Sequence, residues 1–445
     1  MLGKQKPISG KGNVTPEIVV EAAERFGTPL YLYDKSFITQ KCEKLLSMPN
    51  AYGLIVRYAM KSNSTMGILQ LITGLGLYID LSSLNEGRRA YDAEIPFSKM
   101  ILTTQEVPVE RDRTKLEEMI KNGLKYNVCS LRQLNLISDF ASENNIHLSM
   151  RVHPGVGSGE SSTRNTGDKY SCFGVHLTDI EKALAFAQSK GLLFDEVHVH
   201  IGSGGDPVKW RENIDRELGF VEKYFPDAEI VNFGGGLKEA RMPYEKPADI
   251  QDLGLYAKQR IEEFYERTGR KLVMEIEPGT YIMANAGYVI TQVIDKKQTG
   301  PDGFEFLVLD GGMEVNARPL FYGSKHPFYV VSKKGELLST EIDLSKLDPE
   351  KDLRIPSGRN CESGDCQSLD EHGSILPRLM ANPAIGDYVA IGGTGAYCSS
   401  MAPHNYNSHE QAPEVLLRPD KSLEILRQRQ TLKQITANER PLSRL

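Results

Sequence analysis

Short apolar runs alternate with amphipathic stretches through the first two thirds of the chain. Short runs without alternation are typical of strands buried on both faces, whereas the longer stretches repeat apolar residues at helical spacing. The predicted strands are residues 54–60, 77–80, 99–104, 125–130, 147–154, 196–202, 229–235 and 271–279. The predicted helices between them include 108–122, 178–190 and 252–268. Eight such alternations predict an α/β fold, a closed TIM-like (β/α)8 barrel, with an open doubly wound sheet as the alternative.

The pattern changes after about residue 287. Stretches 288–297, 304–310, 327–334 and 387–393 have the composition of strands joined by turns, with no long helical pattern between them. We therefore predict an all-β second domain. Charged residues dominate 336–353, where we expect a surface loop.

Polar residues or glycines stand where the predicted barrel strands stop. In a (β/α)8 barrel these carboxyl ends meet on one face, which carries the chemistry. The residues are Lys61, Asp80, Ser82, Thr103, Ser130, His153, His200, Gly234, Gly235, Gly236 and Glu277. Any one of them could be a turn residue, but together they predict an active site at this rim.

Composition narrows the classes of partner. The 445 residues carry a net charge of -6, which argues against a nucleic-acid partner. No apolar run is long enough to span a membrane, and the polar N-terminus lacks the apolar region of a secretory signal. Six cysteines in this length do not make a disulfide framework, and Cys361 and Cys366 are not spaced as zinc ligands. We expect a cytoplasmic protein with no membrane partner and no bound metal.

Lys61 follows the first predicted barrel strand, in the stretch RYAMKSN. A lysine at a strand end commonly extends its ammonium group to water. At the mouth of a barrel, desolvation would instead lower the pKa of the amine and favour a Schiff base with an aldehyde. An aldehyde cofactor also requires a phosphate-binding loop and an electronic partner for its ring.

Other strand ends offer these groups. The glycines of FGGG, residues 233–236, would let backbone N–H groups approach an anion, although a tight turn explains them equally well. The Glu277 carboxylate could hold a pyridine nitrogen protonated or merely cap a Pro-Gly turn. His200 could stack on a ring or be a structural histidine, and Ser203 lies in the small-residue loop that follows it.

Two stretches in the second domain add candidate chemistry. NCESGD places Cys361 beside Glu362 in a loop that contains glycine, where the thiol could be a proton donor or simply buried. GTGAYCSSM presents Tyr397 after a glycine hinge.

The motifs YAMKSN, HVHIGS, FGGG, EPG, CESGD and GAY, in this order, resemble the fold type III pyridoxal-phosphate decarboxylases, and within them the meso-diaminopimelate decarboxylases. The likeness runs from about Tyr31 to the C-terminus and includes 151–175, NARPLFYG, NYNS, PEVLL and RQRQTL.

The resemblance implies a role for each candidate residue. Lys61, His200 and Cys361 would be catalytic: Lys61 would hold pyridoxal 5'-phosphate covalently, His200 would stack on its ring, and Cys361 would lie near the reacting carbon. Glu277 would pair with the pyridine nitrogen. The phosphate would be bound by Ser203, Gly234, Gly235, Gly236 and Tyr397. The substrate would be bound by Arg318, Tyr322, Tyr397 and Glu362.

The resemblance also implies the architecture and the assembly. The fold would be the alanine racemase-like fold type III, with a barrel at 36–283 and a β-rich domain formed by 1–35 and 284–445. Residues 28–34 would form the strand that leads from the β-rich domain into the barrel. Cys361 and Glu362 would enter the active site of the second subunit, so the protein would be a head-to-tail homodimer with shared sites.

The implied activity is decarboxylation of meso-2,6-diaminopimelate to L-lysine and CO2. The family's EPG motif normally continues with arginine, and here Thr280 stands in that place. Its NPG is here HPG, with His153. Thr280 keeps open a second hypothesis, a related decarboxylase of lysine, ornithine or a carboxylated polyamine precursor. A non-catalytic cofactor-binding homologue is the third.

Overall fold

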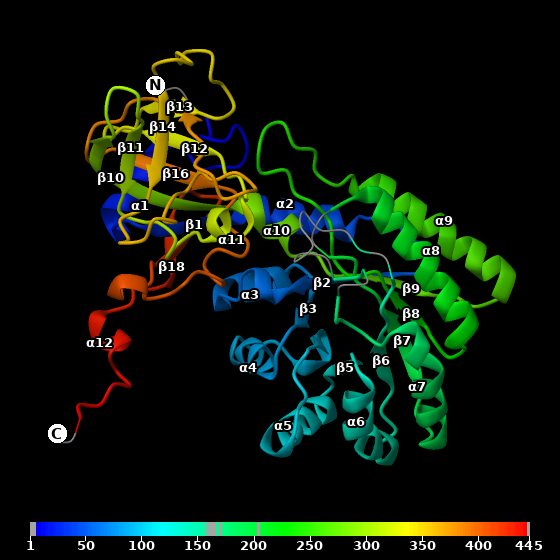
Figure 1. Cartoon of the computed structure of the whole chain (residues 1–445). Helices are drawn as coiled ribbons and strands as arrows, with labels where there is room; N and C mark the ends of the chain where they lie inside the picture. Colours follow the sequence, from blue (N-terminus) through cyan, green and yellow to red (C-terminus); the bar gives the residue numbers. More distant parts are fainter. Residues whose placement is uncertain (1–5, 156, 158–165, 169–170, 203–204, 443–445) are drawn as a thin grey trace. The chain divides into compact units, whose positions relative to one another are not determined.

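Eight parallel strands close into a barrel in the order β2-β3-β4-β5-β6-β7-β8-β9. The computed structural model describes residues 6–155, 157, 166–168, 171–202 and 205–442 (Figure 1). Residues 39–239 and 246–281 form the barrel unit, and residues up to 38, 240–245 and from 282 onward form a second unit, the β unit. The closed barrel confirms the predicted (β/α)8 fold.

The barrel strands overlap all eight predicted runs. They are β2 (Leu54–Ala59), β3 (Tyr78–Leu81), β4 (Met100–Thr103), β5 (Lys125–Val128), β6 (Leu148–Arg151), β7 (Phe194–His198), β8 (Ile230–Asn232) and β9 (Val273–Ile276). The helices are α2 (Lys35–Leu46), α3 (Met66–Gly74), α4 (Leu84–Asp92), α5 (Glu110–Lys121), α6 (Leu131–Glu143), α7 (Leu177–Ser189), α8 (Pro207–Tyr224), α9 (Ile250–Thr268) and α10 (Thr280–Met283).

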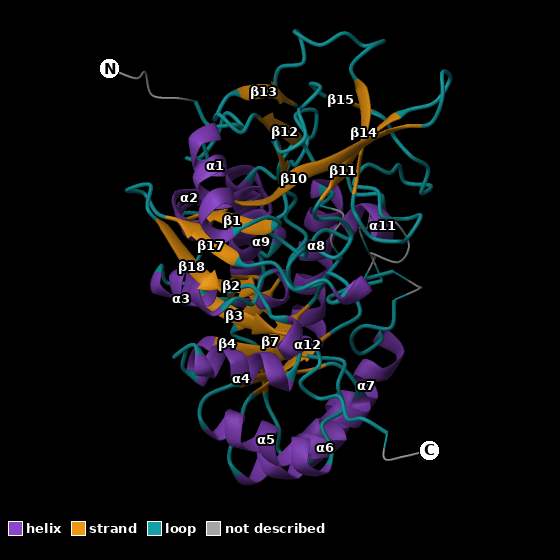
Figure 2. Ribbon diagram, turned by 90° about the vertical axis from the view of Figure 1, so that its left-hand side faces the viewer, coloured by secondary structure: helices purple, strands orange, loops and turns teal. Residues whose placement is uncertain are grey.

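Helices cover the outside of the barrel, as Figure 2 shows for the purple helices around the orange strands. Several begin directly at a strand end. The Ser83 hydroxyl accepts a hydrogen bond from the Glu86 N–H at the start of α4, and Ser130 accepts one from the Gln133 N–H at the start of α6. Ser130, one of the polar residues predicted at the rim, is therefore a helix N-cap.

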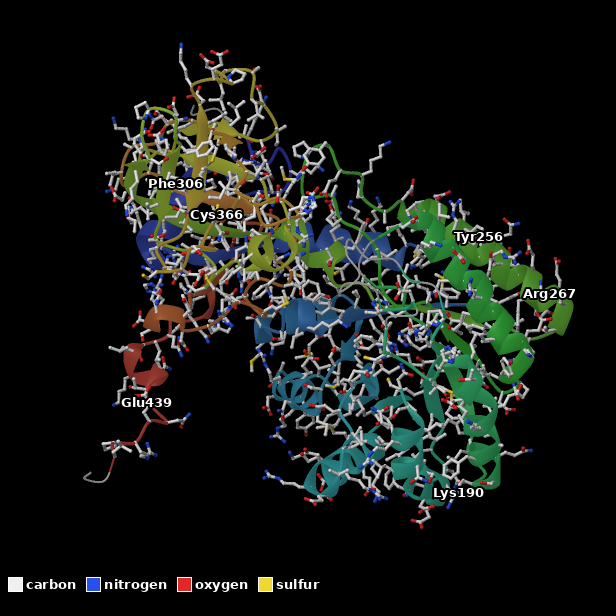
Figure 3. All side chains as sticks on the ribbon, in the orientation of Figure 1. Lys190, Tyr256, Arg267, Phe306, Cys366 and Glu439 are labelled. Carbon is white, nitrogen blue, oxygen red and sulfur yellow. The ribbon has the colours of Figure 1, made fainter. Side chains whose placement is uncertain are left out.

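Helices α8 and α9 lie side by side on the barrel unit. Tyr256 and Arg267, labelled in Figure 3, connect α9 to α8: the Tyr256 hydroxyl donates to Asp215 at 2.7 Å, and Arg267 pairs with Glu222 at 3.0 Å. These contacts are exposed and contribute little stability. Within the described residues, no helix combines the length and the apolar character needed to cross a membrane.

The β unit is built on a mixed sheet in the order β13-β12-β16-β10-β1-β17-β18, with β11, β14 and β15 attached through β10. The early strand β1 pairs with β10 on one side and β17 on the other. Helix α1 and the inward faces of these strands form an apolar core that includes Ile18, Leu32, Ile290 and Val415. A smaller core joins Phe306 to Cys366, both labelled in Figure 3.

The elements of the β unit are α1 (Pro16–Phe26), β1 (Leu30–Asp34), β10 (Gly287–Gln298), β11 (Glu305–Leu309), α11 (Arg318–Tyr322), β12 (Phe328–Val331), β13 (Leu337–Thr340), β14 (Leu353–Ser357), β15 (Arg378–Leu379), β16 (Tyr388–Gly392), β17 (Glu414–Leu417), β18 (Leu423–Arg427) and α12 (Leu432–Ile435). The prediction of a surface loop at 336–353 is wrong at its start. Strand β13 forms there because it pairs with β12 at the edge of the sheet.

Candidate active site

Lys61 emerges from a short 3-10 turn, Met60–Ser62, at the end of β2. Met60 and Ser62 are buried, and the Ser62 hydroxyl bonds to the Tyr58 hydroxyl at 2.9 Å. Tyr58 in turn donates to the Asn63 carbonyl oxygen at 2.9 Å. The backbone on both sides of Lys61 is therefore fixed, while its side chain is 46% exposed. The lysine is held at the barrel mouth by its neighbours, with its amine accessible.

Asp80, at the end of β3, is the carboxylate next to Lys61. Its Oδ2 lies 4.0 Å from Lys61 Nζ, and its Oδ1 is buried without a hydrogen-bond partner among the described residues. Burial and the charge of Glu277 raise the pKa of Asp80 well above its ordinary value, against the opposing effect of Lys61.

Glu277 follows β9 and is buried at the same rim. Its Oε2 lies 3.1 Å from Nε2 of His198, and its Oε1 accepts a hydrogen bond of 2.8 Å from Asn232 Nδ2. Burial alone would raise the pKa of Glu277, but the interaction and hydrogen bond with His198, together with the charge of Lys61, hold it below the ordinary value. Glu277 is thus an ionised carboxylate in a buried position, able to accept from a cationic N–H.

The glycines after β8 form a tight loop beside His200. Gly234 and Gly236 have φ of 66° and 91°, which favour glycine. A Cβ on Gly235 would lie 2.8 Å from the Glu277 carbonyl oxygen and 3.2 Å from His200 Cε1. No side chain could fit there, so the backbone comes close to both residues.

His200 is the ring that this loop touches. The Gly235 N–H donates to His200 Nδ1 at 2.9 Å. Burial, with the charges of Arg151 and Lys61, lowers the pKa of His200 well below its ordinary value. The imidazole is therefore neutral, with Nδ1 as acceptor and its proton on Nε2. Such a flat, uncharged ring suits stacking. Ser203, predicted in the following loop, lies outside the described residues.

Arg151 is a rim residue that the sequence reasoning missed. It ends β6, is buried, and has an Nη2 without a hydrogen-bond partner among the described residues. Its guanidinium lies 4.8 Å from the centre of the Phe173 ring. The neighbouring strand-end residue His153 is occupied locally instead, because its Nε2 contacts the Asp168 carbonyl oxygen at 2.9 Å and its Nδ1 accepts from Gly155 N–H. Arg151 could have been predicted as a rim residue from its position at the end of the strand.

The barrel rim fits pyridoxal phosphate. An aldehyde needs an accessible amine, which Lys61 offers, and a pyridine nitrogen needs an ionised carboxylate, which Glu277 offers. The three glycines directly after β8 form a loop of the kind that binds an anion through its backbone, and His200 offers a ring face. Asp80 Oδ1 and Arg151 Nη2, which have no hydrogen-bond partner in the described part of the chain, provide a further acceptor and donor.

A second set of candidates lies within the β unit. Arg318, at the start of α11, is buried and has an Nε without a hydrogen-bond partner among the described residues. Its guanidinium carbon lies 5.5 Å from the ring centre of Tyr322 and 5.9 Å from that of Tyr397. The structure therefore brings together Arg318, Tyr322 and Tyr397, three of the four predicted substrate-binding residues. A buried guanidinium between two aromatic rings is suited to binding a carboxylate.

The CESGD loop is held in shape by its own hydrogen bonds. Cys361 is exposed, and its N–H donates to Asn407 Oδ1 at 2.9 Å. The Glu362 carboxylate accepts from the Gly364 N–H, and this bond lowers the pKa of Glu362. A Cβ on Gly364 would lie 2.8 Å from Leu320, so the loop packs closely on α11. Cys361 and Glu362 are thus presented outward on an ordered loop.

Comparison with known proteins adds family and function. The family described as "Pyridoxal-dependent decarboxylase, pyridoxal binding domain" matches residues 38–284. The chain is 30% identical over 435 residues to the diaminopimelate decarboxylase of Escherichia coli strain K12, covering 96% of this chain and 97% of that protein. A crystal structure of a diaminopimelate decarboxylase superimposes with a TM-score of 0.85 at 28% identity, covering 97% of this chain and 98% of that one. The M. jannaschii diaminopimelate decarboxylase in complex with L-lysine gives 0.79 at 25% identity, covering 99% of each chain.

Proposed function

The chain belongs to the diaminopimelate decarboxylases, a family of pyridoxal-dependent decarboxylases, and from this membership we propose that it converts meso-2,6-diaminopimelate to L-lysine and CO2. One observation about the barrel supports assigning this reaction to particular residues. Lys61, His200, Glu277 and the glycine loop all stand at the carboxyl ends of strands in one barrel. Bound pyridoxal phosphate supplies an aldehyde for the substrate amine and a ring that withdraws the electrons left when CO2 departs.

In the barrel unit we assign each residue one task. Lys61 would hold the cofactor aldehyde through its amine. Glu277 keeps a proton on the ring nitrogen, which its ionised state supports. His200 covers one face of the ring. The loop at Gly234, Gly235 and Gly236 binds the phosphate, with Ser203 and Tyr397 as further proposed contacts. The Gly234 and Gly235 N–H groups already donate to Asn232 and His200, so the Gly236 N–H is the donor we assign to the phosphate.

In the β unit we assign substrate recognition and proton return. Arg318 and Tyr322, with Tyr397, bind a substrate carboxylate, which the buried and aromatic setting of Arg318 supports. Glu362 binds the substrate amino group, and the Cys361 thiol returns a proton to the reacting carbon. Both residues are exposed in the single chain. We propose that they complete the site of a partner subunit in a homodimer.

The proposed location is the cytoplasm. All six cysteines are unpaired, and an exposed thiol such as Cys361 stays available in a reducing compartment.

A labelling experiment tests the cofactor assignment. The purified protein should be yellow, and borohydride reduction followed by peptide mapping should place the pyridoxyl group on Lys61. Lys61→Ala should lose turnover by orders of magnitude because covalent catalysis is lost. Lys190→Ala, an exposed lysine at the end of α7, is the matched control and should keep activity. An adduct on any other lysine would contradict the assignment.

A substrate panel tests the reaction. CO2 release should be fastest with meso-diaminopimelate and slower with D-lysine and with D- or L-ornithine. A preference for a monocarboxylate would mean that the protein is a lysine or ornithine decarboxylase instead. Thr280, in place of the arginine, is the reason to test this alternative. A bound cofactor without CO2 release from any amino acid would favour a non-catalytic homologue.

A further inference from the structure

Asn232 connects the two parts of the barrel rim that face the cofactor. It is fully buried at the end of β8. Its Nδ2 donates to Glu277 Oε1 at 2.8 Å and to Glu275 Oε1 at 2.6 Å, and a third acceptor, Glu196 Oε1, lies at 3.4 Å. Its Oδ1 accepts from the Gly234 N–H at 3.0 Å.

These contacts fix the orientation of the amide. An amide NH2 has two protons, and the two short bonds to Glu277 and Glu275 use both. Turning the amide over would place its oxygen against two carboxylates and its NH2 against the Gly234 N–H. Only the observed orientation satisfies all three neighbours, so Asn232 holds the Glu277 carboxylate and the glycine loop in one arrangement.

The second oxygen of Glu277 is held by His198. Nε2 of His198 lies 3.1 Å from Glu277 Oε2, and the His198 ring stacks near that of His200, with centres 6.5 Å apart. Both Glu277 oxygens therefore receive a hydrogen bond from a buried side chain. A buried carboxylate with both oxygens bonded keeps its charge and cannot rotate.

The acidic surroundings make the neutrality of Asn232 important. Glu275 is paired with Arg57, whose Nε donates at 2.5 Å to the Oε1 that also accepts from Asn232. Burial and the charge of Glu275 raise the pKa of Glu196 to about 7. A neutral donor between these carboxylates lets Glu277 remain charged without another negative charge in contact with it.

We propose that Asn232 and His198 are positioning residues that fix the direction and the negative charge of Glu277 toward the cofactor ring, and that Asn232 couples Glu277 to the phosphate-binding loop. This inference rests on the proposed cofactor role of Glu277. Asn232 and His198 do not themselves touch the cofactor in this assignment. They act through Glu277 and the loop.

Several charged or titratable groups influence Glu277. The cationic or basic groups are Arg57 from β2, Lys61 from the following turn, and His198 and His200 from β7 and its end. The acidic groups are Asp80 from β3, Glu217 from α8 and Glu275 from β9, with the Cys129 thiol after β5.

Asn232→Asp is the sharpest test because it keeps the shape and the acceptor for Gly234 N–H. It replaces the donor by a third carboxyl between Glu275 and Glu277, so the cluster takes up a proton. The Glu277 pKa should then rise, and its ionised fraction should grow only as the pH is raised. We expect kcat to fall about tenfold for each pH unit below the new ionisation and to recover at higher pH. The absorption spectrum of the bound cofactor should titrate over the same range, and the Kd of the apoprotein for pyridoxal phosphate should rise.

Asn127→Asp is the matched control. Asn127 is also fully buried in the barrel, on β5, where it bonds to the Thr103 and Ser149 hydroxyls. The control also buries an extra carboxyl, but hydroxyl partners can turn to donate to it. Its pH profile and cofactor spectrum should stay those of the wild type.

His198→Gln is the second variant, because glutamine keeps a hydrogen-bond donor but lacks the basic imidazole ring. It should shift the same spectral titration upward in pH, by less than Asn232→Asp. The proposal is overturned if neither Asn232→Asp nor His198→Gln shifts this titration or the cofactor Kd relative to Asn127→Asp. If Asn232→Asp does not fold, the His198→Gln titration alone decides. Failure of the proposed function is a separate result: wild-type protein would release no CO2 from meso-diaminopimelate, while the cofactor titrations could still be measured.

Discussion

Thr280 stands one residue after a close contact between two parts of the barrel rim. A Cβ on Gly279 would lie 3.1 Å from Ser62 Cβ, so the EPG turn packs directly on the turn that carries Lys61. Thr280 begins α10 and is half-buried. The related decarboxylases that the sequence resembles carry arginine here, near the cofactor phosphate and the substrate carboxylate. The chain therefore lacks one charge-assisted contact at a position where geometry leaves little freedom.

Thr280→Arg should strengthen substrate binding. A hydrogen bond to a charged group contributes about 1.5–3 kcal/mol, so we expect KM for meso-diaminopimelate to fall about tenfold or more. The kcat should change less, because a contact made equally to substrate and transition state alters KM alone. Steady-state kinetics with meso-diaminopimelate and D-lysine measure the effect. D-lysine, which lacks the second carboxylate, should gain less.

Thr280→Met controls for the added length without the charge and should leave KM near the wild-type value. A higher KM in Thr280→Arg would mean that another side chain already fills this volume. In that case Arg318 and Tyr322 would carry carboxylate recognition without an arginine at position 280.

The sequence predicted those rim residues that stand directly after a strand. Lys61, His200, Glu277 and the glycines follow strands, and the barrel brings strand ends together, so their grouping could be predicted. The roles of Asn232 and His198 could not be predicted, because each residue lies within a strand. Their roles come from hydrogen bonds to Glu277 at the end of another strand, and the sequence does not show which side chains meet there. Arg151 was overlooked beside His153, whose two ring nitrogens turn out to bond within their own loop.

At the scale of elements, the loop after β8 is the tightest part of the rim. Its backbone passes between His200 and the carbonyl of Glu277, and the Glu277 N–H donates back to the Gly234 carbonyl oxygen at 2.9 Å. Two strand ends are thus joined by backbone contacts that tolerate no side chain.

Gly235→Ala should weaken cofactor binding. The new Cβ would be 2.8 Å from the Glu277 carbonyl oxygen, and relieving such overpacking costs about 1–3 kcal/mol. If the loop moves, the Kd for pyridoxal phosphate should rise about 10- to 100-fold. Fluorescence titration of the apoprotein measures it. Gly219→Ala, inside α8 with no atom within 4 Å of its Cβ, should leave the Kd unchanged. Equal Kd values in the two variants would mean that the loop is not the phosphate site.

Elements with strong periodicity were predictable, and edge elements were not. The eight barrel strands are apolar and lie between helices, so the apolar runs and the helical spacing on either side predicted the same elements. Strand β13 was missed because half of its residues are exposed and charged residues surround it, although it pairs with the nearby strand β12. Strand β14 pairs with β11 and β15 pairs with β14, partners far apart in sequence, so no local pattern marks these two strands.

At the scale of the whole molecule, the proposed chemistry is divided between two units of the chain. Lys61 and Glu277 belong to the barrel unit, and Arg318, Cys361 and Glu362 belong to the β unit. Hydrogen bonds within the chain hold the loop in shape, yet Cys361 and Glu362 stay exposed on it. A partner subunit that receives this loop would explain why an ordered loop exposes these two side chains.

Mixing two inactive variants tests the shared site. If each site takes Lys61 from one subunit and Cys361 from the other, a hybrid of Lys61→Ala and Cys361→Ala subunits contains one intact site and one doubly altered site. Random exchange makes half of the dimers hybrids, so activity should return to about a quarter of the wild-type level. CO2 release from meso-diaminopimelate measures this, with exchange verified by differently tagged subunits. Mixing Lys61→Ala with a Lys61→Ala/Cys361→Ala double variant is the control, and it should stay inactive because no site can hold the cofactor covalently. If tagged subunits exchange and the first mixture also stays inactive, each site takes both residues from one chain, and the in-trans role of Cys361 is wrong.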